Sequence, residues 1–220
     1  IAKESNVDLA FYVKGVTSGD YDNDGWQDIY LSTMNGKNVL LRNLGLENDQ
    51  VSFEDVSILS GIGNDRGDTF TTWFWDFDND GWLDIFVCDY TFNNSLAYDA
   101  AAEKLGISSE KRNTVYLYHN NGDGTFTNQA EEFGLNKIVF SMGGNFGDID
   151  FDGYLDMYLG TGNPKLQSLL PNKMFYNMKG RGFEDITASS RLGHLQKGHG
   201  VSFADIDNDG DQDIHIQMGG

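Results

Sequence analysis

The sequence has little positive charge, almost no cysteine and no long apolar run. Only 15 Lys and Arg residues accompany 34 Asp and Glu residues, so the formal net charge is −19 and a nucleic-acid backbone or an anionic membrane would be repelled. The single cysteine, Cys88, excludes an intramolecular disulfide and any metal site built from several cysteines. No stretch approaches the ~18–20 apolar residues that span a bilayer. We therefore expect neither nucleic-acid binding nor membrane insertion.

Proline is also scarce, with 2 residues against 27 glycines, while 13% of the residues are aromatic and 39% hydrophobic. This composition is typical of a packed core with many tight turns and excludes disorder as the main state. The chain begins with Ile1, without the basic and apolar pattern of a secretory leader. We expect it to be a piece of a longer protein.

One acidic segment recurs four times, beginning at residues 20, 76, 148 and 205, with the sequences DYDNDGWQDI, DFDNDGWLDI, DIDFDGYLDM and DIDNDGDQDI. Between the copies lie an Asn-containing apolar stretch, at 38–43, 115–120 and 173–177, and a Phe-led stretch, at 53–57, 126–130 and 183–187. A fixed order of such segments indicates an architecture built from repeats.

Each repeat contains the patterns of four strands. Aliphatic residues alternate after every acidic segment, as in Ile29/Leu31, Ile85/Val87, Met157/Leu159 and Ile214/Ile216, which predicts a half-buried strand. A glycine-rich strand, suited to backbones that crowd together, precedes the segment. We predict an all-β fold over residues 1–220, a β-propeller with about three and a half blades of four antiparallel strands. The insertion at 90–113 contains a predicted short helix at 96–106.

The acidic segments carry the chemistry. Asp stands at positions 1, 3, 5 and 9 of a nine-residue loop, and Gly at position 6 can adopt the positive φ that folds the loop back. Several hard oxygen ligands, completed by the carbonyl of position 7 and water, suit Ca²⁺ better than Mg²⁺ or Zn²⁺. We predict about four Ca²⁺ ions, held by Asp20, Asp22, Asp24, Trp26 and Asp28; Asp76, Asp78, Asp80, Trp82 and Asp84; Asp148, Asp150, Asp152, Tyr154 and Asp156; and Asp205, Asp207, Asp209, Asp211 and Asp213.

Neither a simple turn nor an EF-hand accounts for these loops. Asp-Asn-Asp-Gly is good turn chemistry, but a turn needs one or two such residues, and four crowded carboxylates without a cation repel one another. An EF-hand needs Glu at position 12 and flanking helices, whereas position 12 is Leu31, Val87, Leu159 or Ile216.

These loops, with Phe146-Gly147 directly ahead of Asp148, resemble the FG-GAP/VCBS repeats of integrin-α-type β-propellers. The segments at 120–126, 183–187 and 193–220 are similar to the branch that carries an ASPIC/UnbV module, as in cartilage acidic protein. The resemblance implies a secreted or cell-envelope propeller, usually of seven blades, stabilised by calcium and used for binding or adhesion without catalysis. Phe151 departs from the Asn found at position 4 of the other loops.

The sequence contains no recognised catalytic motif. We expect His194 and His199 to play surface or hydrogen-bonding roles and Cys88 to pack in the core. Trp73 and Trp75 are interpreted as core residues, with an aromatic platform for a sugar as the alternative. The predicted function is calcium-dependent binding of a protein; a glycan ligand and, less favoured, a propeller-type lyase or hydrolase are the alternatives.

The incomplete blade leaves its edges open. Ile1 to Glu4 resembles the tail of a preceding blade's outer strand, and the fourth repeat ends after two strands. Because propellers remove sheet edges by radial closure, we expect either self-association through these edges or a larger closed ring.

Overall fold

The computed structural model describes residues 2–34, 36–62, 68–91, 96–107, 114–162 and 170–219. These residues form two compact units, each described here by itself. The first unit comprises Ile1–Asp76, Asp80–Val87 and Tyr116–Gln129, and the second comprises Phe77–Asn79, Cys88–Val115 and Ala130–Gly220. No helix among the described residues is long and apolar enough to cross a membrane.

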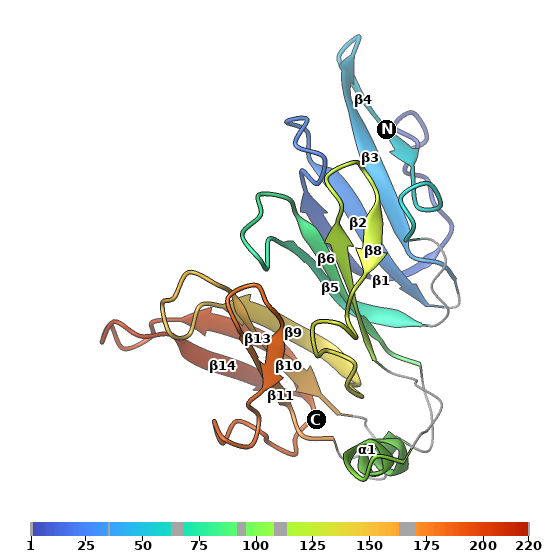
Figure 1. Cartoon of the computed structure of the whole chain (residues 1–220). Coiled ribbons are helices and arrows are strands. Elements are labelled where there is room, and N and C mark those ends of the chain that lie inside the picture. Colours follow the sequence, from blue (N-terminus) through green and yellow to red (C-terminus); the bar gives the residue numbers. More distant parts are fainter. Residues whose placement is uncertain are drawn as a thin grey trace. The chain divides into compact units, whose positions relative to one another are not determined.

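The first unit is built around two four-stranded sheets, in which strands adjacent in sequence are also neighbours in the sheet (Figure 1). Blade 1 consists of β1 (Tyr12–Gly19), β2 (Asp28–Met34), β3 (Val39–Glu47) and β4 (Gln50–Asp55). Blade 2 consists of β5 (Thr69–Trp75), β6 (Asp84–Asp89), β7 (Val115–Asn120) and β8 (Phe126–Asn128).

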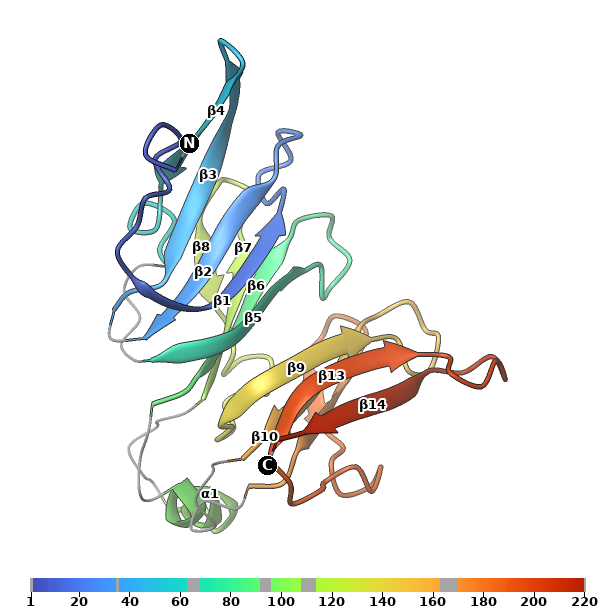
Figure 2. The same ribbon diagram turned by 180° about the vertical axis from the view of Figure 1, so that it is seen from behind.

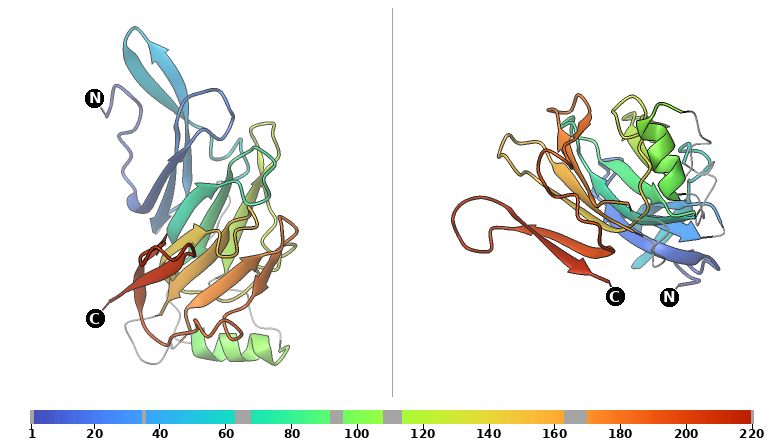
Figure 3. Two further views of the ribbon diagram at one scale, coloured as in Figure 1. Left: turned by 90° about the vertical axis from the view of Figure 1, so that its left-hand side faces the viewer. Right: turned by 90° about the horizontal axis from the view of Figure 1, so that it is seen from below.

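The second unit contains a third four-stranded sheet and a two-stranded one. Blade 3 consists of β9 (Ser141–Gly147), β10 (Asp156–Thr161), β11 (Lys173–Asn177) and β12 (Phe183–Asp185), and blade 4 of the hairpin β13 (Gly198–Ala204) and β14 (Asp213–Met218). Figure 2 shows β9 beside β13, and Figure 3 shows the β13–β14 hairpin in red. Three complete sheets and one half-sheet confirm the predicted β-propeller blades.

The second strand of a blade is more deeply buried than the alternating pattern predicts. All six residues of β6 and of β10 are buried, so the prediction of a half-buried strand is wrong for these two. In blade 1, Tyr30 of β2 belongs to a core that also contains Phe74 and Tyr118, while the next residue, Leu31, packs in a separate cluster with Val39. The strand is therefore covered on both faces, by the next blade on one side and by neighbouring segments on the other.

Crowded backbones explain the glycines of the first strand, as predicted. A Cβ added at Gly143 of β9 would overlap the carbonyl oxygen of His199 in β13, and one at Gly15 of β1 would lie 2.5 Å from the carbonyl oxygen of Phe70 in β5. Gly200 holds the matching position in β13, where an added Cβ would meet only Gln217 at 3.4 Å, an ordinary contact.

Gly143→Ala should therefore destabilise the protein by about 3 kcal/mol, because one backbone must move away from the other. The matched control, Gly200→Ala, should change the free energy of unfolding by less than ~1 kcal/mol. Chemical denaturation of both variants measures the difference. Equal losses would contradict the close approach of β9 and β13.

A turn after the outer strand links each blade to the next. Ser60 and Phe133 lie in the turns that follow β4 and β8, and their carbonyl oxygens accept the N–H groups of Phe126 (2.8 Å) and Phe183 (2.7 Å), the first residues of β8 and β12. Near the N-terminus, the carbonyl of Ser5 accepts the N–H of Phe53 in β4 at 3.1 Å.

This pattern corrects the prediction for the N-terminal segment. Ile1 lies outside the described residues, and Ala2 to Asn6 form a turn, not the tail of a strand. The N–H of Val7 donates to the carbonyl of Ala2 (2.9 Å), as the N–H of Ile62 donates to that of Ser57 (3.0 Å) after β4. The first residues thus repeat the turn that follows an outer strand.

The predicted helix in the insertion is present as α1 (Leu96–Lys104), drawn in green in Figure 3. Leu96 is fully buried and packs with Ile138, Phe140 and Leu170. The rest of the insertion falls partly at 92–95 and 108–113, outside the described residues.

Candidate cation-binding loops

The four acidic loops, numbered 1 to 4 in chain order (residues 20–28, 76–84, 148–156 and 205–213), have the same backbone hydrogen bonds. The Asp at position 1 accepts the N–H of position 5 on Oδ1 and the N–H of position 6 on Oδ2. The two distances are 3.0 and 2.9 Å in loop 1, 3.0 and 3.0 Å in loop 2, 3.1 and 2.9 Å in loop 3, and 3.1 and 3.1 Å in loop 4. The first carboxylate therefore folds each loop.

Positions 4 and 6 both have positive φ. The glycines at position 6 have φ of 89–97°, as predicted, with no atom near an added Cβ. The residue at position 4 has φ of 56–61°. In two loops its Asn side chain also donates to the position-6 carbonyl of the following loop, from Asn23 to Gly81 (3.1 Å) and from Asn79 to Gly153 (2.9 Å). Asn suits this place because it tolerates left-handed backbone.

Phe151 holds position 4 of loop 3 with φ 58° and a side chain that is 59% exposed. Phe151→Asn should stabilise the protein by about 1 kcal/mol, because Asn adopts this conformation with less strain. Phe151→Ala, which keeps the strained Cβ and removes the ring, is the control and should give no such gain. Thermal unfolding of the two variants decides; a loss of stability in Phe151→Asn would refute the argument.

The Asp at position 9 is the most enclosed member of the loop. Asp28, Asp84 and Asp156 are at most 1% exposed. Oδ2 of Asp28 accepts the N–H of Tyr21 (3.1 Å) and Oδ1 accepts that of Asn43 (2.8 Å), and Asp156 is bound in the same way by Ile149 and Asn177. Burial nevertheless raises the pKa of Asp28 and of Asp156 to about 6, more than these donors lower it.

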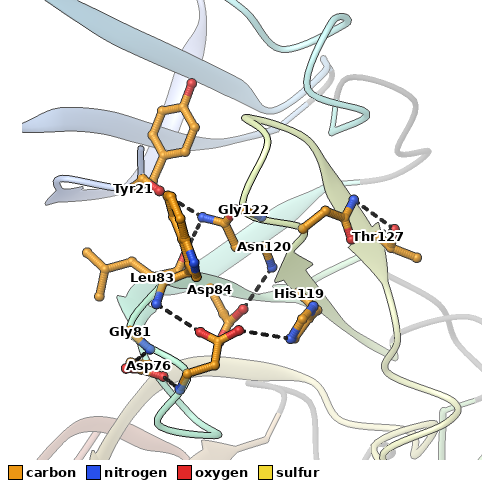
Figure 4. A network of polar contacts seen from close by, with 12 residues as sticks. Tyr21, Asp76, Gly81, Leu83, Asp84, His119, Asn120, Gly122 and Thr127 are labelled. Atoms are coloured by element: carbon orange, nitrogen blue, oxygen red, sulfur yellow. Dashed lines mark hydrogen bonds and ion pairs between the residues drawn. The ribbon is translucent and has the colours of Figure 1, made fainter. Parts of the chain in front are cut away.

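An Asn of the third strand, the last residue of β7 and of β11 and an inner residue of β3, is a site residue whose role the sequence did not reveal. In blade 2, the N–H of Asn120 donates to Asp84 (2.8 Å), and its side-chain amide donates to the carbonyls of Leu83 (3.1 Å) and Tyr21 (2.8 Å; Figure 4). Its Oδ1 accepts the N–H of Gly122 at 3.0 Å. Asn43 and Asn177 repeat the bonds to their own loops. Recurrence of this Asn after apolar stretches was the only signal in the sequence.

The structure brings together the carboxylates of positions 1, 3 and 9. In every loop, one oxygen from each lies within 4.8 Å of the others, as in Asp20, Asp22 and Asp28. The Asp at position 5 is outside this group of three. Its Oδ1 accepts the N–H of position 7, and in loop 1 the N–H of Trp26 donates to Oδ1 of Asp24 at 2.9 Å. The same bond occurs at Asp80, Asp152 and Asp209. The side chains of Trp26 and Trp82 pack beside Gly45 and Gly122, which leaves the position-7 residue its carbonyl as a ligand.

The donor set fits a divalent cation. Oδ1 of Asp22 and Oδ2 of Asp152 are buried and accept no hydrogen bond; the ammonium of Lys179 lies 3.6 Å from the second of these oxygens. A buried carboxylate oxygen without a donor is costly unless a positive charge satisfies it. All side-chain atoms in the groups of positions 1, 3 and 9 are carboxylate oxygens, the ligands of hard cations, and in loop 2 a further group joins Asp78 and Asp80 to a nitrogen of His119.

A residue of the third strand reaches three of the loops, and it differs in each blade. The Nε of Arg42 lies 2.6 Å from Oδ2 of Asp22, and the hydroxyl of Tyr176 donates to Oδ2 of Asp150 at 2.9 Å. His119 Nε2 lies 3.7 Å from Oδ2 of Asp80. The bond to Asp150 raises the pKa of Tyr176 to about 12, so this hydroxyl stays neutral.

The raised pKa values predict the pH dependence of the metal-free protein. Because Asp28 and Asp156 bind protons more tightly when folded, their contribution to stability is fully present below about pH 4 and is lost as the pH rises through about 6. Ionising each buried carboxyl costs the folded state about 3 kcal/mol. In EDTA, the melting temperature should therefore rise when the pH is lowered from 7 to 5.

Asp28→Asn should flatten this dependence, even if the variant is less stable at every pH. Asp123, an exposed residue whose pKa is lowered by its hydrogen bonds with Thr125, provides the control: Asp123→Asn should keep the wild-type slope. A melting temperature that rises with pH in both variants would show that the buried carboxylates do not titrate in this range.

The other candidate residues lie apart from the loops' carboxylate groups. Trp73 and Trp75 are 7% and 2% exposed, and Trp73 stacks on Phe86 with ring centroids 4.2 Å apart, as expected for core residues. Cys88 is fully buried, and burial raises the pKa of its thiol. His194 and His199 are exposed, and neither belongs to a metal-ligating group of the described residues.

Each unit also contains a cavity. The cavity in the first unit has a volume of about 400 Å³ and is lined by residues that include Arg42, Trp82 and Asp123. The cavity in the second unit has a volume of about 660 Å³, and Lys104, Lys137, Lys173 and Arg191 are among its lining residues. Two acidic residues of the same lining, Glu103 and Asp185, pair with Lys137 (3.5 Å) and Lys173 (2.7 Å).

Comparison with known proteins identifies one family. The model of the FG-GAP-like repeat matches residues 20–91 and 100–159, more than half of the chain. None of the curated proteins compared with the chain matches it. Among solved structures, a rhamnogalacturonan lyase PL11 of Bacillus licheniformis is similar, with 15% identity and a TM-score of 0.45. The likeness covers 93% of this chain and 39% of the lyase chain, so this chain spans less than half of that protein.

Proposed function

We propose, from the premise that this chain belongs to the FG-GAP-like repeat family, that its four acidic loops bind Ca²⁺ and that the blades they stabilise form a binding module. The observation that carries the proposal is the convergence of three carboxylates within 4.8 Å in every loop, one of which in loop 1, Asp22, has a buried oxygen that accepts no hydrogen bond. The match to the family covers loops 1, 2 and 3. The ASPIC/UnbV branch stays a prediction.

The choice of Ca²⁺ rests on the type and number of ligands. Carboxylates at positions 1, 3 and 9, the second oxygen of position 5, the carbonyl of position 7 and water would give six or more hard oxygen ligands, which Ca²⁺ accepts in flexible geometry. Zn²⁺ prefers nitrogen and sulfur ligands, and Mg²⁺ demands a tighter octahedron. A nearby divalent charge would also favour the ionised form of Asp28 and Asp156, whose pKa burial raises.

The role of the ion in this proposal is structural. Each loop connects the first and second strands of a blade, and in the three complete blades its position-9 carboxylate is bonded to the third strand. A cation would offset part of the negative charge of the loop and, in these blades, hold three strands in place. At a free calcium concentration tenfold above Kd, each site adds about 1.4 kcal/mol to the free energy of unfolding.

Equilibrium dialysis should find four Ca²⁺ ions per chain, with Kd of roughly 10⁻⁴ to 10⁻³ M, as in extracellular modules. EDTA should lower the melting temperature. Asp150→Asn keeps an acceptor for the Tyr176 hydroxyl but removes one ligand charge, so it should reduce the stoichiometry to three ions.

The control for this experiment is Asp123→Asn, which removes the same charge outside the loops and should leave four ions bound. Fewer than three ions bound to the wild-type chain, or unfolding that is indifferent to EDTA, would refute the proposal.

We further propose that the module is extracellular or in the cell envelope, binds a protein and has no catalytic role. The burial of Trp73 and Trp75 takes away the feature that would favour a glycan platform there. The ring of Tyr90, which follows β6, stacks on Phe140 with ring centroids 4.0 Å apart. A glycan array with and without calcium distinguishes a glycan ligand from a protein, and the edges of blade 4 remain a proposed surface for self-association.

A further inference from the structure

Loops 1 and 3 differ in the charge that contacts the same carboxylate oxygen. Asp22 and Asp150 both hold position 3, and in each the Oδ2 atom is bound by the residue just before the third-strand Asn. In loop 1 the partner is the Arg42 guanidinium, with Nε at 2.6 Å. In loop 3 it is the neutral Tyr176 hydroxyl, at 2.9 Å. The two loops otherwise share one backbone geometry.

The guanidinium of Arg42 bridges two of the proposed ligands. Besides Asp22, it approaches Asp24 at position 5, with a terminal nitrogen 3.5 Å from Oδ2. The carboxylates are largely sheltered, with side-chain exposures of 14% for Asp22 and 29% for Asp24. A planar guanidinium placed against two such carboxylates is a preorganised counter-ion, and solvent screens it only in part.

Loop 3 also has a basic neighbour, but one that is held more loosely. Lys179 Nζ lies 3.6 Å from Oδ2 of Asp152, and its side chain is 57% exposed. An exposed ammonium on a flexible stem forms a weak, screened pair and can turn into solvent when a cation arrives. Arg42 contacts two carboxylates at once and is therefore the stronger competitor.

We propose that Arg42 is a built-in competitor of the cation, which makes loop 1 a weaker calcium site than loop 3. This inference rests on the proposed function, because it concerns the affinity of one of the proposed sites. Calcium at loop 1 must share Asp22 and Asp24 with the positive charge of Arg42. At loop 3 the corresponding oxygen, Oδ2 of Asp150, is bound by the neutral hydroxyl of Tyr176. Loop 1 therefore fills after loop 3, and blade 1 responds to calcium concentrations at which loop 3 is already loaded.

The test is a calcium titration of the full 220-residue chain followed by NMR. The position-6 glycines give one backbone amide signal in each loop, from Gly25, Gly81, Gly153 and Gly210, so each site is read separately. In the wild-type chain, the midpoint for Gly25 should lie roughly tenfold above that for Gly153, since a unit charge acts at short range on loop 1.

Arg42→Tyr, which copies the arrangement of loop 3, should lower the Gly25 midpoint roughly tenfold and leave Gly153 unchanged. Arg42→Gln, the second variant if the tyrosine disturbs folding, should act in the same direction. Arg181→Gln is the control, because Arg181 is exposed, contacts the carbonyl of Met178 and carries the same charge. It should leave the Gly25 midpoint where it is.

The outcomes separate this inference from the proposed function. Calcium-dependent shifts at all four glycines with equal midpoints, or a Gly25 midpoint that neither Arg42 variant lowers, would overturn the role of Arg42 alone. If none of the four glycine signals shifts when calcium is added, calcium binding itself is overturned, and this inference with it.

Discussion

The structure depends on a carboxylate that is buried at the start of the second strand of each complete blade. Asp28, Asp84 and Asp156 are almost inaccessible to solvent, and a buried charge is tolerated only when donors or a counter-ion satisfy it. The backbone of the acidic loop supplies one N–H group to Asp28 and Asp156, and the third-strand Asn supplies one to all three. Loop, second strand and third strand are thereby fixed to one another. A bound cation would complete this arrangement.

The same elements join consecutive repeats. The side-chain amide of Asn120 reaches the carbonyl of Tyr21 in loop 1, and that of Asn177 reaches the carbonyl of Phe77 in loop 2. The turn after an outer strand adds a backbone hydrogen bond to the next outer strand. Each repeat therefore stabilises its neighbour through bonds at two places, a nearest-neighbour arrangement expected of repeat proteins.

Variation is confined to a few positions on this constant frame. Phe151 stands where the other loops have Asn, and it keeps the positive φ of position 4 at a conformational cost. Arg42, His119 and Tyr176 share one place in the blade but present different chemistry to their loops. Four loops with one backbone geometry can thus differ in cation affinity, because affinity depends on the charges around the ligands as well as on the ligands themselves.

The sequence by itself determined the repeats, the strands and the carboxylates, because these follow from local patterns: alternation gives a strand, and Gly at position 6 gives a loop that folds back. It did not show that Asn79 bonds to the carbonyl of Gly153, that Asn120 is bonded to Asp84, or that β6 and β10 are buried on both faces. Those features join residues far apart in the chain. Only the tertiary structure decided them. A hydrogen bond between repeats depends on how the blades pack, and a local sequence pattern does not specify which residues of two repeats come within bonding distance.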